Sequence, residues 1–65
     1  MTLMEALNEC RNGSLVSHEE FDSNEYMYFS NGSFYYEDGT NLDNHLEWLM
    51  TQEWAKQGWY VKNCA

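Results

Sequence analysis

Proline is absent from this 65-residue chain, and basic side chains are scarce. Lysine and arginine together number 3 against 11 aspartate and glutamate residues, which gives a formal net charge of -8 with the histidines neutral. Proteins that bind nucleic acid use lysine and arginine to displace counterions from the phosphates. We therefore expect no direct binding of nucleic acid, and an anionic membrane surface would repel the chain.

Long apolar runs are missing as well. No stretch reaches the roughly 18 apolar residues of a membrane-spanning helix. The N-terminal residues MTLMEALNECRNGSL have neither a basic start nor an apolar run, so no signal peptide is predicted. We expect a cytoplasmic protein with reduced Cys10 and Cys64, and a disulfide between them is the alternative.

Motifs for catalysis or metal binding are also lacking. His18 and His45 have carboxylates nearby in sequence, but acid–base catalysis needs such groups to converge in a cleft, and nothing predicts one. Both histidines are expected to be solvated. The cluster His18-Glu19-Glu20-Asp22 does not have the spacing of zinc ligands. We expect no enzyme activity, no metal site and no cofactor.

Aromatic residues, in contrast, make up 17% of a chain whose length fits one domain over residues 1–65. A domain this small is marginally stable, because ordering the chain costs about as much as apolar burial contributes. A homo-oligomer would add stability. We expect Trp48, Trp54 and Trp59 to build most of the core; alternatively, Trp48 or Trp54 points outward and anchors a partner.

The N-terminal segment is predicted to form a helix at about residues 3–12. Thr2 and Glu5 have the spacing of a capping box, and Asn12-Gly13 is a typical helix stop. The apolar positions repeat at the helical period: Leu3, Ala6, Leu7 and Cys10. A short strand is expected at residues 14–17, followed by a polar loop in which Phe21 is a hydrophobic anchor.

The most specific local pattern predicts a β-hairpin. Two aromatic runs, Glu25–Ser30 and Ser33–Asp38, flank Asn31-Gly32, the preferred residues of a two-residue type I′ turn. This turn pairs residue 29 with 34 and residue 28 with 35, and side chains alternate between the two faces. The face expected to be buried carries Met27, Phe29, Phe34 and Tyr36. The opposite face carries Tyr26, Tyr28, Tyr35 and Glu37.

The C-terminal part is predicted to be a helix over residues 41–57 and a strand over 59–62. Asp43 or Asn44 would cap the helix, and a second short helix could begin near Thr51. The apolar positions at helical spacing are Leu42, Leu46, Leu49 and Met50. In the strand, Trp59 and Val61 would point inward, and Tyr60 and Lys62 outward. The predicted fold is α+β, in the order α-β-β-β-α-β, with helices packed on one face of a small antiparallel sheet.

Nine of the acidic residues lie between residues 12 and 55, where no cation occurs. This charge favours a partner with a basic or anion-binding surface, although it could serve solubility alone. We expect the contact face to consist of Tyr26, Tyr28, Tyr35 and Glu37, rimmed by Glu19, Glu20, Asp22 and Glu25. The tyrosines would bury area, and the carboxylates would orient the partner.

Residues 4–16 (MEALNECRNGSLV) and 53–61 (EWAKQGWYV) resemble the small phage proteins of the second Thoeris anti-defence family. The resemblance implies a phage-like origin, a helix-plus-sheet fold and a role without catalysis. Members of that family are oligomeric sponges for a cyclic nucleotide signal. They carry an arginine and a tryptophan after the first strand, where this chain has His18-Glu-Glu-Phe21, so no ligand-binding residue is transferred.

These observations together favour a small acidic accessory protein of phage type that binds a host protein without catalysis, in a defence or anti-defence context. One alternative is an oligomeric sponge for a cyclic nucleotide, with cations pooled from several chains. The other is a DNA mimic that inhibits a nucleic-acid-binding host enzyme. Nine carboxylates at the charge spacing of DNA would copy only about 15 Å of duplex, so mimicry would need a dimer.

Overall fold

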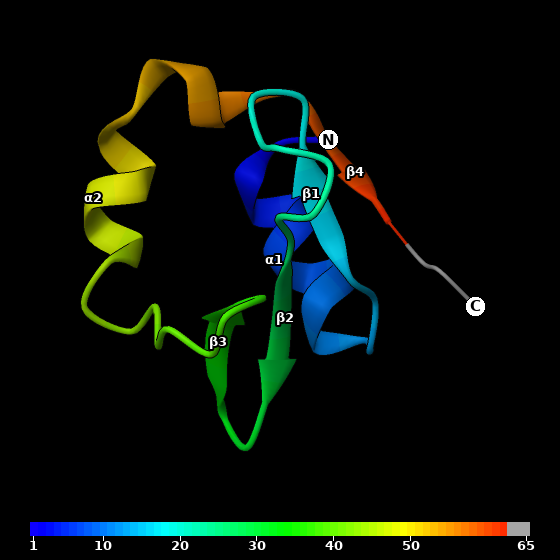
Figure 1. Cartoon of the computed structure of the whole chain (residues 1–65). Helices are drawn as coiled ribbons and strands as arrows, with labels where there is room; N and C mark the ends of the chain where they lie inside the picture. The colour runs from blue at the N-terminus through cyan, green and yellow to red at the C-terminus, as the bar shows by residue number, and fades with distance from the viewer. Residues whose placement is uncertain (63–65) are drawn as a thin grey trace.

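Two helices, one short 3₁₀ helix and four strands make up residues 1–62, which are the residues that the computed structural model describes. The elements are α1 (Leu3–Arg11), β1 (Val16–His18), β2 (Met27–Ser30), β3 (Ser33–Tyr36), α2 (Leu46–Thr51), η1 (Glu53–Lys56) and β4 (Trp59–Val61). The strands form one antiparallel sheet in the order β3-β2-β1-β4. The predicted α+β class is confirmed, with η1 added between α2 and β4 (Figure 1).

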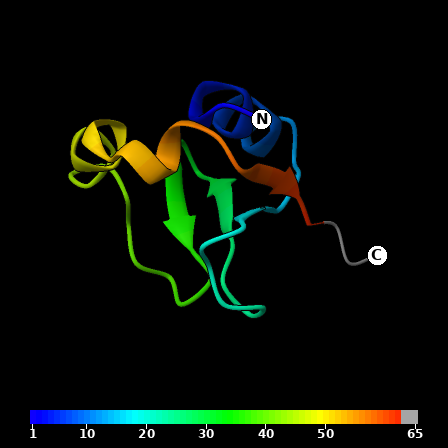
Figure 2. The ribbon, with the colours of Figure 1, turned by 90° about the horizontal axis from the view of Figure 1, so that it is seen from above.

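Helix α1 forms as predicted and lies against the sheet, as the view from above shows (Figure 2). Its capping box is complete: the Glu5 amide donates to the Thr2 hydroxyl over 3.2 Å, and the Thr2 amide donates to the Glu5 carboxylate over 2.8 Å. These two bonds satisfy amides that a helix start leaves without partners. The predicted apolar stripe is buried: Leu3, Ala6, Leu7 and Cys10.

The hairpin has the predicted register. Phe29 pairs with Phe34 and Tyr28 with Tyr35, and the turn residues Asn31 and Gly32 have φ of 51° and 83°. Both values are positive, as a type I′ turn requires. On the face that α1 covers, Met27 and Phe34 are buried, while Phe29 and Tyr36 are half-buried and pack against the core.

The helix predicted for residues 41–57 is wrong at its start, and of the two alternatives for its end the second short helix is the one that forms, as η1. Asn41 bridges to Tyr35, and the Leu42 amide donates to the Phe34 carbonyl over 2.8 Å, so the chain runs extended along β3. Leu42 is fully buried there, and this pairing overrides its helical spacing. Helix α2 begins only at Leu46, without a side-chain cap from Asp43 or Asn44. The helix ends at Thr51, because the backbone of Gln52 is extended.

The first strand also has other bounds than predicted: it covers residues 16–18 instead of 14–17.

Two of the three tryptophans are not in the core, which corrects the main expectation. Trp59 is buried and its indole N–H donates to the Ala55 carbonyl over 2.6 Å, but Trp48 and Trp54 are 48% and 36% exposed. Helix α2 stands beside the β3 edge of the sheet rather than over its centre (Figures 1 and 2). The aliphatic side chains of Leu42 and Leu49 fill the core on this side instead.

Two further residues, His18 and Val61, differ from expectation. His18 is not solvated: it lies on β1 with 1% of its surface exposed. Val61 is exposed rather than inward, because it ends β4, which is an edge strand among the strands of residues 1–62, while Tyr60 is exposed as predicted. Cys10 is a buried free thiol, and Cys64 lies outside the described residues.

Candidate interaction surfaces

The first candidate surface is the side of the hairpin that faces away from α1. Tyr28 and Tyr35 stack across the strands with ring centroids 5.6 Å apart, and Tyr26 lies 6.2 Å from Tyr28 along β2. All three rings are half-buried, so each still presents surface to solvent. We call Tyr26, Tyr28, Tyr35 and Glu37 the outer tyrosine face; the structure brings these four predicted residues together.

Hydrogen bonds hold the carboxylates beside this face. Glu37 accepts a 3.3 Å bond from the Tyr26 amide, and Glu25 accepts a 2.9 Å bond from the Asp22 amide. One cation lies at the border, where the Lys62 ammonium donates to the Ser23 carbonyl and stands 6.0 Å from the Tyr26 ring centroid. The face therefore combines apolar rings with acidic groups that keep free acceptor oxygens.

The remaining predicted rim residues do not form one ring around the tyrosines. Asp22 is exposed in the loop between β1 and β2. The side chain of Glu19 lies close to Gly58, within 2.9 Å of where a Cβ would stand. Glu20 lines a pocket that includes Tyr36, a residue of the face that α1 covers. The loop acids are thus divided between two parts of the surface.

The pocket that Glu20 lines is the second candidate site, with a volume of about 430 Å³. We call it the aromatic pocket; it is lined by Glu20, Phe21, Tyr36, His45, Trp48 and Trp54. Burial, followed by repulsion from Glu25 and Glu37, raises the pKa of Tyr36, so its phenol is neutral at physiological pH. No sequence motif predicts this pocket, because four separate segments supply its residues. Two features of the sequence point toward it: Phe21 is expected to be a hydrophobic anchor in a polar loop, and one alternative places Trp48 or Trp54 on the surface.

His18 lies behind the aromatic pocket and has a structural role. Its ring contacts those of Trp54 and Trp59 at 5.1 and 4.7 Å. Its Nδ1 accepts a 2.9 Å bond from the Glu20 amide, so Nε2 carries the proton and donates to the Gln57 carbonyl at 2.6 Å. Both nitrogens are engaged, so neither is available as a metal ligand. Within residues 1–62, no group of three His, Cys, Asp or Glu side chains could hold a metal ion.

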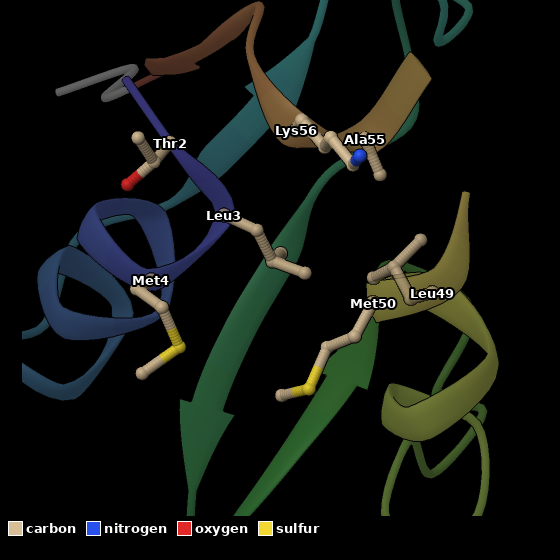
Figure 3. Close-up of a pocket in the computed structure, with 7 residues that line it drawn as sticks. All are labelled: Thr2, Leu3, Met4, Leu49, Met50, Ala55 and Lys56. Atoms are coloured by element: carbon tan, nitrogen blue, oxygen red, sulfur yellow. The ribbon is translucent and has the colours of Figure 1, made fainter. Parts of the chain in front are cut away.

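A third hollow is an apolar groove of about 250 Å³ between α1 and the α2–η1 segment. Leu3 and Met4 line one side, and Leu49 and Met50 line the other (Figure 3). Met4 and Met50 are 63% and 49% exposed. Exposed methionines adapt to many shapes, so the groove has contact area but little to select a ligand.

Comparison with family models, with curated proteins and with solved structures gives no match. The resemblance to the second Thoeris anti-defence family stays a prediction from residues 4–16 and 53–61. Within the described residues, no helix is long and apolar enough to span a membrane.

Proposed function

We propose that this protein acts without catalysis, by binding a host protein that has a basic or anion-binding surface. The observation that carries the proposal is the outer tyrosine face, where Tyr28 and Tyr35 stack and stay partly exposed beside Glu37. Tyrosine is common in binding hot spots because it buries a large area at a low cost in side-chain entropy. The net charge of -8 would speed the approach of a basic partner.

The charge of the aromatic pocket favours this proposal over a nucleotide sponge that would use this pocket. Glu20 lines the aromatic pocket, and no lysine or arginine among the described residues joins it there. A phosphate group would meet repulsion instead of the donors that it needs. A sponge would have to bring cations from neighbouring chains, and a DNA mimic finds no specific support in the arrangement of the acids.

The test is capture of partners from a bacterial lysate by immobilised wild-type protein and by Tyr28→Ala, at low and at high salt. Tyr28 occupies the middle of the outer tyrosine face, so its removal should weaken association by roughly 2 kcal/mol or more. High salt should also weaken capture, because it screens attraction between exposed charges.

Met4→Ala is the control, because Met4 is 63% exposed on α1, which covers the opposite side of the sheet from the outer tyrosine face. A partner retained equally by wild type, Tyr28→Ala and Met4→Ala would contradict the assignment of this face. Sedimentation of the purified proteins covers self-association: a wild-type dimer lost in Tyr28→Ala would mean that a second copy occupies the face.

A further inference from the structure

The aromatic pocket has a composition that folding does not explain. Two of its rings, Trp48 and Trp54, stay 48% and 36% exposed, although burying a tryptophan is among the largest apolar gains open to a small domain. His45, Trp48 and Trp54 lie on the α2–η1 side. Residues 20 and 21 of the β1–β2 loop and residue 36 of β3 complete the wall.

Five aromatic rings follow one another in an open series along the wall of the pocket. Their centroids are 6.2 Å apart from Trp54 to Phe21 and 6.2 Å apart from Phe21 to Tyr36. The series continues with 6.1 Å from Tyr36 to His45 and 4.5 Å from His45 to Trp48. The first three pairs are steeply tilted, by 62° to 74°, whereas His45 and Trp48 stack at 30°, so the rings form a curved wall whose last two members lie face to face.

One carboxylate stands in this wall. Glu20 is exposed at the pocket, and among residues 1–62 the only salt bridge joins Lys56 to Glu53, which leaves the Glu20 carboxylate without a cation. Aromatic faces carry partial negative charge and attract cations, most strongly at tryptophan. The pocket therefore offers two tryptophans and one acidic side chain to a ligand, and Phe21, Tyr36 and His45 complete its lining.

We propose that the aromatic pocket binds a quaternary ammonium group, such as that of choline or of a trimethylated lysine side chain. Such a group spreads its positive charge over methyl groups and has no N–H donors to satisfy. A guanidinium has five N–H donors, more than the roughly four acceptor sites of one carboxylate, and a primary ammonium is strongly hydrated and would lose that water against the aromatic rings. Cages of aromatic side chains are the kind of site that recognises methylated cations.

The direct test compares choline with 3,3-dimethyl-1-butanol, its uncharged analogue of the same shape. Binding to the wild-type protein is followed by tryptophan fluorescence and by amide chemical shifts of the pocket residues. Choline should bind at least about fivefold more tightly, because only the charged ligand gains from the rings and from Glu20. Equal binding of the two, or no binding of choline, would overturn the proposal.

Two pairs of variants locate the effect. Glu20→Gln should weaken choline binding several-fold, whereas Glu19→Gln, the same change next to it but outside the pocket lining, should weaken it less. Trp48→Leu should abolish most of the binding, and Tyr60→Leu on β4 should leave it unchanged. Equal losses in Glu20→Gln and Glu19→Gln would mean general attraction to an acidic surface and would contradict a specific site.

Folding is checked by circular dichroism, and Glu20→Gln keeps the test decisive even if Trp48→Leu unfolds. A comparison of trimethyl-lysine amide with choline then identifies the source of the quaternary ammonium group. Tighter binding of trimethyl-lysine amide indicates a methylated side chain of a protein, and tighter binding of choline indicates a small molecule; either result supports the site. The site is separate from the outer tyrosine face, so loss of choline binding and loss of partner capture are independent results.

Discussion

The two faces of the β2–β3 hairpin are built by alternate residues of the same strands, yet they have opposite environments. Met27 is fully buried between α1 and the sheet, while its neighbour Tyr28 lies on the outer tyrosine face and is half-buried. The covered face of the hairpin carries Met27, Phe29, Phe34 and Tyr36 against the core, and the outer face carries three phenol rings and the carboxylate of Glu37. One helix placed on one side therefore gives adjacent residues different environments: one face packs in the core, and the other is the face for which we propose contact with a partner.

The sharpest test of this difference is to truncate the two neighbours separately. Met27→Ala removes a fully buried side chain and should lower the free energy of unfolding by about 2–5 kcal/mol. Tyr28→Ala loses a stacked cross-strand pair and should cost about 1 kcal/mol. Urea unfolding followed by circular dichroism measures both changes.

Met27→Leu is the control for Met27→Ala, because it keeps the volume and should cost less than about 1.5 kcal/mol. Equal losses in Met27→Ala and Tyr28→Ala would break the comparison. They would mean that the outer tyrosine face is covered in solution, and a concentration-dependent melting temperature would then identify a second copy as the cover.

The second prediction concerns Gly58, which lies where the covered face meets the β1–β2 loop. Its φ is +96°, and a Cβ there would stand 2.8 Å from Nε2 of the buried His18. Gly39 has a similar φ of +90°, but a Cβ would meet nothing within 4 Å. Alanine is strained in left-handed backbone, so both Gly→Ala variants should lose about 1–2 kcal/mol of stability from this cause alone.

Gly58→Ala should therefore destabilise the protein by about 1–3 kcal/mol more than Gly39→Ala, because it also displaces a hydrogen-bonded ring. Thermal melts of both variants measure the difference. If the two melting temperatures agree, the contact of His18 with Gly58 contributes nothing to stability.

Local patterns explain why part of the fold could be predicted from the sequence. The capping box of α1 and the Asn31-Gly32 turn depend on residues within a few positions of one another, and both form as expected. The outer tyrosine face follows from that turn by alternation alone. The type of each of these elements, and the strand register of the hairpin, could therefore be predicted from the sequence without knowledge of tertiary contacts.

The remaining errors involve contacts between distant segments. Leu42 has helical spacing with Leu46, but its amide pairs with the carbonyl of Phe34 in β3. His18 follows a strand in a polar sequence, yet Gln57 and Trp59 bury it from the other end of the chain. The aromatic pocket was missed for the same reason, since Phe21 and Trp48 come together only when α2 stands beside β3.

The smallest effect is expected from the thiol of Cys10, which lies on the buried side of α1 against the sheet and titrates only in alkaline solution. Its Sγ is 3.8 Å from the Met27 carbonyl, and burial, followed by repulsion from Glu9, raises the pKa of the thiol from 9.0 to about 11. The folded protein holds this proton more tightly than the unfolded chain does. Its contribution to stability is therefore complete below about pH 9 and is lost as the pH rises toward 11.

Cys10→Ala removes this titration, so its free energy of unfolding should fall less steeply between about pH 9 and pH 11 than that of the wild type. The slope is the readout, because the shorter side chain also lowers stability at every pH. Tyr36, whose pKa burial also raises, titrates in both proteins and leaves a common residual slope. Urea unfolding in the presence of a reductant measures both curves. Parallel curves would show that the Cys10 thiol is as accessible to hydroxide in the folded protein as in the unfolded chain, and that α1 does not seal this side of the sheet.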